Sequence, residues 1–313
     1  MSERKGQIVN ADFLDFIGRQ AKTDAFNLYW PYDLAIADPP YFKTIGEHWD
    51  YEWRTKEEYL VWCEGWIARV EYSLRVGGTL YLFGYPRMLS YLLPICVKHG
   101  FMFRQQIVID KGIKAVAGRA TKDYKQFTTC TECIFMFIKN NIIFAHDYLL
   151  RAQRQKGISA KDINEALGVK SNGGGMWSIW TGDNVCAQFP SREQWEKLSE
   201  ILSLTVKYDD VAQTFNPIQG LTDVWSDIDF YEEPRLHPTQ KPLKLYERLV
   251  LASSNEGDKV LDPFMGSGTT ALVCEKHNRH YTCFDKDIKC CNIANRRLES
   301  GWQGELWHGT LIP

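Results

Sequence analysis

The chain has 313 residues, 44% of them hydrophobic and 13% aromatic, which is enough apolar material for one large core and a smaller additional module. Its formal net charge of -2 argues against a protein that coats nucleic acid electrostatically, although a local basic patch is compatible with it. No segment approaches the roughly 18 uncharged apolar residues of a membrane span, and residues 1–6 lack the apolar core of a signal peptide. We therefore expect a soluble, cytoplasmic protein without a membrane partner.

The nine cysteines are an odd number without paired spacings, so we interpret them as reduced thiols. Cys130 and Cys133 have the spacing of a metal-binding pair, but Cys290 and Cys291 are adjacent and cannot supply the second pair. No metal site is expected, and Cys130 and Cys133 are interpreted as flanking an apolar strand.

The first half of the chain alternates short apolar runs with helical periodicity. Strands are predicted at residues 32–37, 79–83, 101–109 and 133–138, and helices at 55–76 and 87–99. Gly77 and Gly78 are interpreted as the stop signal of the first helix, and Pro94 is expected to kink the second. The last two strands are close enough in sequence to be antiparallel neighbours.

Residues 151–231 have a different texture, that of a small helical insert. Ser159 with Asp162, and Ser191 with Gln194, predict two capped helices, at 159–167 and 191–202. The last third returns to strands at 259–262 and 280–284 and to helices at 243–253, 269–277 and 287–299. Because strand and helix alternate at both ends of the chain, the sequence predicts a parallel α/β sheet.

A glycine-rich turn joins the strand at 259–262 to the helix that follows it. Gly266 and Gly268 permit a close backbone approach to a ligand, and the start of the helix offers free N–H groups. Asp285 follows the next strand, where an acid can accept hydrogen bonds from both ribose hydroxyls. Ala271 replaces the third glycine of dinucleotide enzymes, so the pattern suits a nucleoside without a pyrophosphate, such as S-adenosylmethionine. A plain tight turn is the alternative.

Asp38-Pro39-Pro40-Tyr41 stands at the end of the strand at 32–37. Two successive prolines make a stiff segment just past the strand, where α/β sheets place ligands. The stiffness would hold the Asp38 carboxylate and a backbone carbonyl as two fixed acceptors for an exocyclic amine, while Tyr41 offers a face for base stacking. Such an arrangement frees the lone pair of a poor amine nucleophile for attack on a sulfonium methyl group. A proline-stiffened turn with a surface tyrosine is the structural alternative.

A cluster of cations lies between the strands at 101–109 and 133–138. The loop at 111–126 either contacts nucleic-acid phosphates or is simply solvated; only Asp110 and Asp123 are acids nearby. The candidate phosphate contacts are Lys111, Lys114, Arg119, Lys122 and Lys125.

Three segments together resemble the DNA amino-methyltransferases, which modify adenine at N6 or cytosine at N4. Asp38 to Tyr41 resembles the catalytic motif of that family, residues 262–270 resemble its cofactor loop, and residues 237–242 (HPTQKP) resemble its third hallmark. The catalytic motif precedes the cofactor loop, which is the circularly permuted arrangement of the β class. The resemblance covers about residues 8–149 and 237–300.

The resemblance implies a Rossmann-like, S-adenosylmethionine-dependent methyltransferase sheet that is circularly permuted. It divides the chain into a catalytic half at 1–150, a helical target-recognition insert at 151–231 and a cofactor-binding half at 232–313. The residues that would be catalytic are Asp38, Pro39, Pro40 and Tyr41. The residues that would bind the cofactor are Asp12, Phe13, Asp38, His237, Thr239, Lys241, Asp262, Phe264, Gly266, Ser267, Gly268, Thr269 and Asp285.

Three assignments keep a second interpretation. Asp12 would contact the adenine of the cofactor, or else cap a helix. Lys241 would neutralise the carboxylate of the cofactor, or else lie in solvent within a proline-rich turn. Thr131-Glu132 resembles the family segment near the target base, but Cys130 and Cys133 depart from the usual His-Glu-Tyr of the family, so base contacts there stay open.

The resemblance also implies double-stranded DNA as the partner, with a target base that flips out of the duplex. Asp38 at the first motif position resembles the adenine-N6 group more than the cytosine-N4 group, which more often begins with Ser. Sequence readout is expected from residues 151–231 and from the loop at 111–126. A homodimer and a cognate restriction enzyme are frequent in this family. The alternatives are cytosine-N4 methylation, an RNA or protein substrate, and a non-catalytic DNA-binding protein on the same fold.

Overall fold

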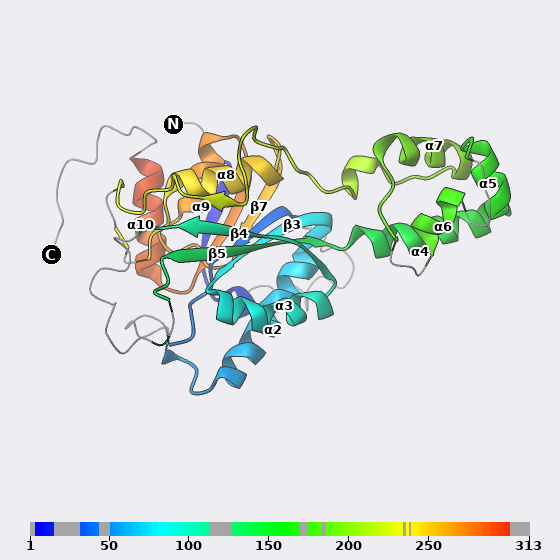
Figure 1. Cartoon of the computed structure of the whole chain (residues 1–313). Helices are drawn as coiled ribbons and strands as arrows, with labels where there is room; N and C mark the ends of the chain where they lie inside the picture. The colour runs from blue at the N-terminus through cyan, green and yellow to red at the C-terminus, as the bar shows by residue number, and fades with distance from the viewer. Residues whose placement is uncertain are drawn as a thin grey trace.

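The computed structural model describes residues 4–15, 32–43, 51–112, 125, 127–169, 175–182, 186–233, 236–237 and 239–300. Within these residues, one sheet of eight strands has the order β1, β8, β7, β2, β3, β5, β4, β6 (Figure 1). The strands are β1 (Gly6–Asn10), β2 (Tyr32–Ala37), β3 (Leu74–Gly84), β4 (Phe101–Asp110), β5 (Thr131–Lys139), β6 (Val224–Trp225), β7 (Lys259–Asp262) and β8 (His280–Asp285). All neighbours are parallel except the pairs that β5 forms with β3 and β4, so the predicted α/β sheet and its predicted antiparallel pair are confirmed.

Helices cover both faces of this sheet. One face carries α2 (Lys56–Ser73) and α3 (Pro86–Lys98), and the other carries α8 (Leu243–Ser253), α9 (Thr269–Lys276) and α10 (Ile288–Glu299) (Figure 1). The side chains of β2 alternate between the two cores: Leu34 and Ile36 pack toward α8–α10, whereas Ala35 and Ala37 pack toward α2 and α3. Among the described residues, no helix has the length and apolar character that would let it cross a membrane.

The junction of α2 and β3 differs from the prediction. The helix predicted to reach residue 76 ends at Ser73, so Gly77 and Gly78 lie inside β3 and are not a stop signal. Gly77 has a φ of +74°, and a Cβ at this position would lie 2.4 Å from the carbonyl oxygen of Val211. The glycine therefore permits the close approach of a distant chain segment, which the local pattern does not reveal. The next helix, α3, continues through Pro94.

A helical unit projects from the sheet (Figure 1). It comprises α4 (Asn141–Lys156), α5 (Ala160–Ala166), α6 (Gly175–Thr181) and α7 (Arg192–Leu202). It has an apolar core of its own, built around three buried tryptophans. Both predicted helix starts are confirmed, because Ser159 with Asp162 and Ser191 with Gln194 form capping boxes.

The limits of this unit differ from the insert predicted at 151–231. Its core already includes Ala145 and extends no further than Val211. Trp225 and Phe230 belong instead to the core of the sheet, since β6 pairs with β4. Residues 212–231 are therefore a return path from the helical unit to the sheet, and not part of the helical unit.

The helical unit joins the sheet at the edge opposite Asp38. β5 is antiparallel to β3, so it begins near the carboxyl end of β3 and delivers the chain into α4 at the other edge. Arg75 holds the returning chain at that edge; it donates to the carbonyl oxygen of Ala212 at 2.8 Å and pairs with Asp33 at 2.6 Å. Along β5 the two edges are about 23 Å apart, at roughly 3.3 Å per residue from Glu132 to Lys139.

Candidate active site

The carboxyl ends of the parallel strands meet at one edge of the sheet, and the candidate residues gather there. Asp38 follows β2, and Asp285 ends β8. Glu132 lies at the same edge because the antiparallel β5 begins there. The chain continues from β2 to β3 on one side and from β7 to β8 on the other, which makes the junction of β2 and β7 a topological switch point where such sheets bind ligands.

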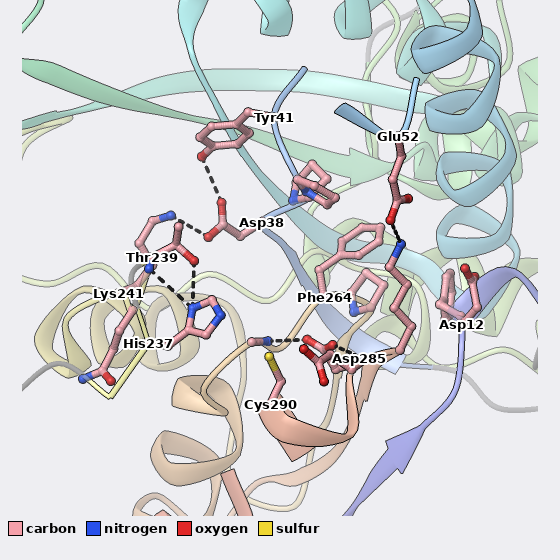
Figure 2. Close-up of a pocket in the computed structure, with 18 of the residues that line it drawn as sticks. Asp12, Asp38, Tyr41, Glu52, His237, Thr239, Lys241, Phe264, Asp285 and Cys290 are labelled. Atoms are coloured by element: carbon pink, nitrogen blue, oxygen red, sulfur yellow. Dashed lines mark hydrogen bonds and ion pairs between the residues drawn. The ribbon is translucent and has the colours of Figure 1, made fainter. Parts of the chain in front are cut away.

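A cavity of about 600 Å³ opens at this edge, within the size range of small-molecule and cofactor sites (Figure 2). All three segments that resemble the family motifs contribute to its lining. Of the residues predicted from the sequence, it is lined by Asp12, Phe13, Asp38, Pro39, Pro40, Tyr41, Lys111, His237, Thr239, Lys241, Phe264, Gly266 and Asp285. Five further aromatic residues line it, namely Trp53, Trp62, Tyr85, Phe230 and Tyr231.

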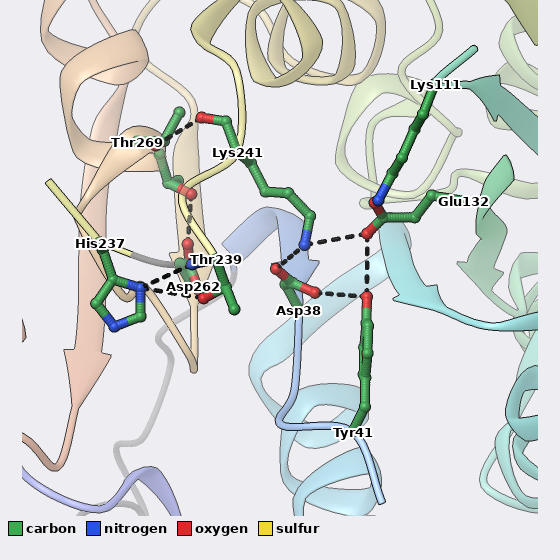
Figure 3. A network of polar contacts seen from close by, with 10 residues as sticks. Asp38, Tyr41, Lys111, Glu132, His237, Thr239, Lys241, Asp262 and Thr269 are labelled. Carbon is green, nitrogen blue, oxygen red and sulfur yellow. Dashed lines mark hydrogen bonds and ion pairs between the residues drawn. The ribbon is translucent and has the colours of Figure 1, made fainter. Parts of the chain in front are cut away.

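Asp38 belongs to a network of charged groups (Figure 3). Its Oδ1 accepts a hydrogen bond of 2.9 Å from the Tyr41 hydroxyl, and its Oδ2 accepts one of 2.5 Å from the Lys241 ammonium. Oε1 of Glu132 accepts from the same two donors, at 3.1 Å from the Tyr41 hydroxyl and 3.0 Å from Lys241 Nζ. The other oxygen of Glu132 pairs with Lys111 at 2.6 Å. Two carboxylates and two ammonium groups thus balance in charge.

These contacts set the protonation of the network. Burial raises the pKa of Glu132, but Lys241 and Lys111 outweigh burial and bring that pKa down to about 2. Burial lowers the pKa of Lys241, yet Asp38 and Glu132 leave it well above its ordinary value. Burial, with Asp38 and Glu132 adding to it, raises the pKa of Tyr41 well above its ordinary value. At neutral pH, Glu132 is therefore an anion, Lys241 a cation and Tyr41 a protonated donor.

The other end of the cavity is built around Asp285 (Figure 2). The backbone N–H of Gly266 donates to its Oδ2 at 3.0 Å, and the backbone N–H of Asp287 donates to its Oδ1 at 2.8 Å. Burial raises the pKa of Asp285 above its ordinary value, while these two donors favour the carboxylate form. A carboxylate oxygen can accept more than one hydrogen bond, so Asp285 can also accept from the hydroxyls of a ligand.

An aromatic wall flanks this end of the cavity. The ring of Trp62 lies 4.5 Å from that of Trp53 and 5.6 Å from that of Phe264, measured between centroids. Glu52 and Lys286, which also line the cavity, form an ion pair with each other (Figure 2). Flat apolar surfaces beside an acid suit a heteroaromatic ring joined to a sugar.

Comparison with known proteins identifies the family. The family described as DNA methylase matches residues 32–296, most of the chain. The chain belongs to this DNA methylase family. It is 31% identical over 266 residues to the Type II methyltransferase M1.MboII of Moraxella bovis, a match that covers 84% of this chain and 87% of that relative. It is 27% identical over 282 residues to M2.DpnII of Streptococcus pneumoniae, covering 86% and 82%.

Other proteins of known structure share the fold of this chain. The M1.HpyAVI–SAM complex covers 93% of this chain and 98% of its own, with a TM-score of 0.55 and 18% sequence identity. The sheet is therefore that of Rossmann-like methyltransferases, as predicted from the sequence.

The lining of the cavity leaves out four residues that the sequence predicted to bind the cofactor: Asp262, Ser267, Gly268 and Thr269. Asp262 is buried and accepts hydrogen bonds from the backbone N–H of Phe264, at 2.9 Å, and from the Thr270 hydroxyl. Ser267 is also buried, and its hydroxyl accepts a hydrogen bond of 3.0 Å from Arg297. Both residues hold the glycine loop from behind the cavity.

Gly268 and Thr269 also support the loop. Gly268 has a φ of +78°, and a Cβ there would lie 2.4 Å from the Cβ of Ala294, so α10 can pack closely only against glycine. The Thr269 hydroxyl donates to the carbonyl oxygen of Lys241 at 3.3 Å. This bond ties the glycine loop to the segment that carries Lys241 (Figure 3).

Asp12 is compatible with both of its interpretations. Its Oδ1 accepts a hydrogen bond of 2.8 Å from the backbone N–H of Leu14, as a helix cap does, and its side chain also lines the cavity. Next to it, Phe13 is buried against Phe284, with 5.3 Å between ring centroids. His237 Nδ1 and the Thr239 hydroxyl are hydrogen-bonded to each other at 3.0 Å.

The predicted phosphate contacts do not share one environment. Lys111 points into the cavity, where it pairs with Glu132 and lies 4.6 Å from the centroid of the Phe230 ring. Lys125 is exposed. Lys114, Arg119 and Lys122 lie outside the described residues.

The sequence did not assign a role to Glu132, the acid of the site with the most polar contacts. From the sequence, Glu132 is only part of a segment that resembles the family segment near the target base, although an acid at the start of an apolar strand is a signal in itself. Tyr85 directly follows β3, as Asp38 directly follows β2, so this position could have identified Tyr85 as a candidate site residue. Trp53 and Trp62 carry no such signal, since helix packing brings them to the cavity.

Proposed function

We propose that this DNA methylase transfers a methyl group from S-adenosylmethionine to the N6 amine of an adenine that has flipped out of double-stranded DNA. The observation that carries the proposal is the single cavity that joins Asp285 and the glycine loop to Asp38 and Tyr41. A methyl donor at one end and an amine at the other would meet inside it.

The residues around Asp285 suit the nucleoside part of this cofactor. The Asp285 carboxylate would accept from the ribose hydroxyls, and Phe264 and Trp62 would contact the faces of the adenine ring. Asp12 would accept from the exocyclic amine of that ring. When bound, S-adenosylmethionine supplies an electrophilic methyl group on a sulfonium centre. Since Lys241 already pairs with Asp38 and Glu132, we assign it to the placement of Asp38 and not to the cofactor carboxylate.

Asp38 would act on the target amine. The adenine amine is a poor nucleophile because its lone pair is delocalised into the ring. Hydrogen bonds from its two N–H groups to fixed acceptors favour a pyramidal nitrogen with an available lone pair. We assign Asp38 Oδ1 and the carbonyl oxygen of Pro39 as these acceptors, since the carbonyl oxygen of Pro40 accepts from the Tyr59 hydroxyl at 3.0 Å. As the new N–C bond forms and the bond between the methyl carbon and the sulfonium sulfur breaks, the electron pair of that bond would stay on the sulfur of the thioether product, and the nitrogen would give up one proton along its hydrogen bond to Asp38.

Tyr41 and Tyr85 would receive the flipped base. Their rings are 5.2 Å apart at an interplanar angle of 67°, and both line the cavity. Extruding a base costs a few kcal/mol, which stacking on an aromatic face and hydrogen bonds to Asp38 would offset.

The first motif residue supports adenine over cytosine. Asp38 resembles the adenine-N6 group, whereas the cytosine-N4 group more often begins with Ser. The test is transfer of labelled methyl groups from S-adenosylmethionine to duplex DNA, followed by mass spectrometry of the digested nucleosides. We expect N6-methyladenine. N4-methylcytosine would overturn the assignment of the base, and the absence of transfer to DNA of any source would overturn the activity.

Residues 151–231 are proposed to recognise the DNA sequence in two parts. The return segment 212–231 ends at the cavity with Phe230 and Tyr231, so it is suited to contact the base pairs next to the target. The helical unit starts at the opposite edge of the sheet, about 23 Å from the edge that carries Asp38 and Glu132, and this distance corresponds to about seven base pairs at ~3.4 Å each. Replacing the exposed Arg151 and Arg154 with Ala should then weaken DNA binding without changing the modified base. A changed base would contradict this division.

The names of the relatives suggest a biological role. We propose that the chain works as a Type II methyltransferase beside a restriction enzyme of the same specificity, and that it forms a homodimer. DNA from cells that express the protein should resist that nuclease, and sedimentation should give twice the mass of the chain. Full cleavage of the DNA, or a monomer at working concentration, would contradict the respective proposal.

A further inference from the structure

The Tyr41 hydroxyl has one proton and two acceptors. It lies 2.9 Å from Asp38 Oδ1 and 3.1 Å from Glu132 Oε1, so both carboxylates are within hydrogen-bond distance of the same oxygen (Figure 3). A hydroxyl carries a single proton and can donate it to only one of them at a time. Rotation about the C–O bond is enough to change the acceptor, and the ring does not have to move.

Each oxygen of Asp38 accepts one hydrogen bond in this arrangement. Tyr41 donates to Oδ1, and Lys241 donates to Oδ2. An oxygen of Asp38 can accept a second hydrogen bond, but it is a weaker acceptor for a substrate amine while Tyr41 donates to it, so binding of the amine is favoured when Tyr41 turns its proton to another acceptor. A buried donor that loses its acceptor costs more than the net value of one hydrogen bond. The displaced donor consequently needs a second acceptor close by.

Glu132 provides that acceptor. We propose that Glu132 is a positioning residue, which takes over the hydrogen bond of Tyr41 when the target amine replaces the Tyr41 hydroxyl on Asp38. The inference rests on the proposed methylation of an amine at Asp38. In this exchange Lys241 stays between the two carboxylates, because it already contacts Glu132 at 3.0 Å as well as Asp38.

Lys111 keeps Glu132 available for this exchange. Its ammonium lies 2.6 Å from Glu132 Oε2, which leaves Oε1 directed at Tyr41 and Lys241. The Glu132 side chain is 3% exposed, so water cannot replace it as the acceptor. Both carboxylates line the cavity, but the Asp38 side chain is the more exposed, at 15%, so it is the one that can exchange its partner for a ligand.

The test is a double-mutant cycle on the full-length protein. Glu132→Leu combined with Lys111→Met removes the acceptor and keeps the network neutral, because one charge of each sign is lost. We expect this pair to lower kcat about tenfold to a hundredfold, while the KM and Kd of S-adenosylmethionine stay unchanged. In a Tyr41→Phe background the hydroxyl that needs a second acceptor is absent, so the same pair should lower kcat less than about threefold.

Equal losses of kcat in both backgrounds would overturn the proposal, because they would show that Glu132 only supports the fold. Glu71→Gln is the matched control. Glu71 pairs with Lys139 at the other end of β5, at 3.2 Å, so this substitution should leave kcat unchanged in both backgrounds.

A second measurement does not depend on activity. In a crystal structure of Asp38→Ala, Tyr41 should keep its ring position and its hydrogen bond to Glu132. A Tyr41 that turns away from Glu132 would refute the exchange. If the unsubstituted protein transfers no methyl group to DNA, the proposed function fails, and this structure still decides the inference.

Discussion

Asp38→Ala removes the carboxylate that accepts from both Tyr41 and Lys241. If Asp38 orients the target amine, its loss should lower kcat by about 10²–10³, or about 2.7–4 kcal/mol, as for other preorganised groups that stabilise a transition state. The effect on the fold should be smaller. Breaking a buried ion pair outright costs about 3–5 kcal/mol, but Lys241 keeps Glu132 as a partner, so we expect a loss of stability of about 1–3 kcal/mol.

The assay is single-turnover transfer of labelled methyl groups to duplex DNA, with the affinity for S-adenosylmethionine measured by calorimetry. Asp33→Asn is the matched control, because Asp33 lies at the other end of the same strand and pairs with Arg75 at 2.6 Å. It should lower stability and leave kcat within about twofold. If Asp38→Ala retained more than about a tenth of the activity, or if Asp33→Asn lost as much as Asp38→Ala, the assignment of Asp38 as amine acceptor would be wrong.

Four further substitutions test the cofactor end. Asp285→Ala should weaken S-adenosylmethionine binding about tenfold to a hundredfold in calorimetry and leave DNA affinity unchanged, since it removes the proposed ribose acceptor; unchanged cofactor affinity would contradict that role. Gly268→Ala should lower the free energy of unfolding by more than about 2 kcal/mol, because the added Cβ would meet Ala294. Gly266→Ala should lower it by only about 1 kcal/mol, because nothing lies within 4 Å of the added Cβ. Equal losses in denaturant unfolding would refute the packing argument. Burial raises the pKa of Asp262 to about 7, so the folded state holds a proton that the unfolded chain releases near pH 4, and the free energy of unfolding should fall as the pH rises from about 4 to about 7. Asp262→Asn should remove that part of the pH dependence, and an unaltered profile would show that Asp262 is ionised in the folded state.

Much of the fold could be predicted because its signals are local. The apolar run before Asp38 gave β2, and the capping boxes at Ser159 and Ser191 gave the starts of α5 and α7. The predicted end of α2 was wrong by three residues, because Gly77 is needed for the close approach of a distant segment at Val211 and does not end the helix. A stop signal and a close-contact glycine look the same in one sequence.

The site was predictable to the same extent. The motif at Asp38 and the acid at Asp285 each stand at the carboxyl end of a predicted strand, and this position places them at the ligand-binding edge of the sheet. The residues of the glycine loop were harder to divide, since a GxG turn does not say which side chains face the ligand. Gly266 lines the cavity, whereas Gly268 packs against α10.

The sequence by itself therefore determined the family, the order of its motifs and the chemical types at both ends of the cavity, because each of these is written in a short contiguous segment. Only the tertiary structure joined Glu132 and Lys111 to Asp38, since these residues come together through the antiparallel pairing of β5 with β3 and β4. It also decided that the helical unit leaves the sheet at the edge opposite Asp38. The direction of β5 fixes that position, and strand direction is a property of pairing that no single segment encodes.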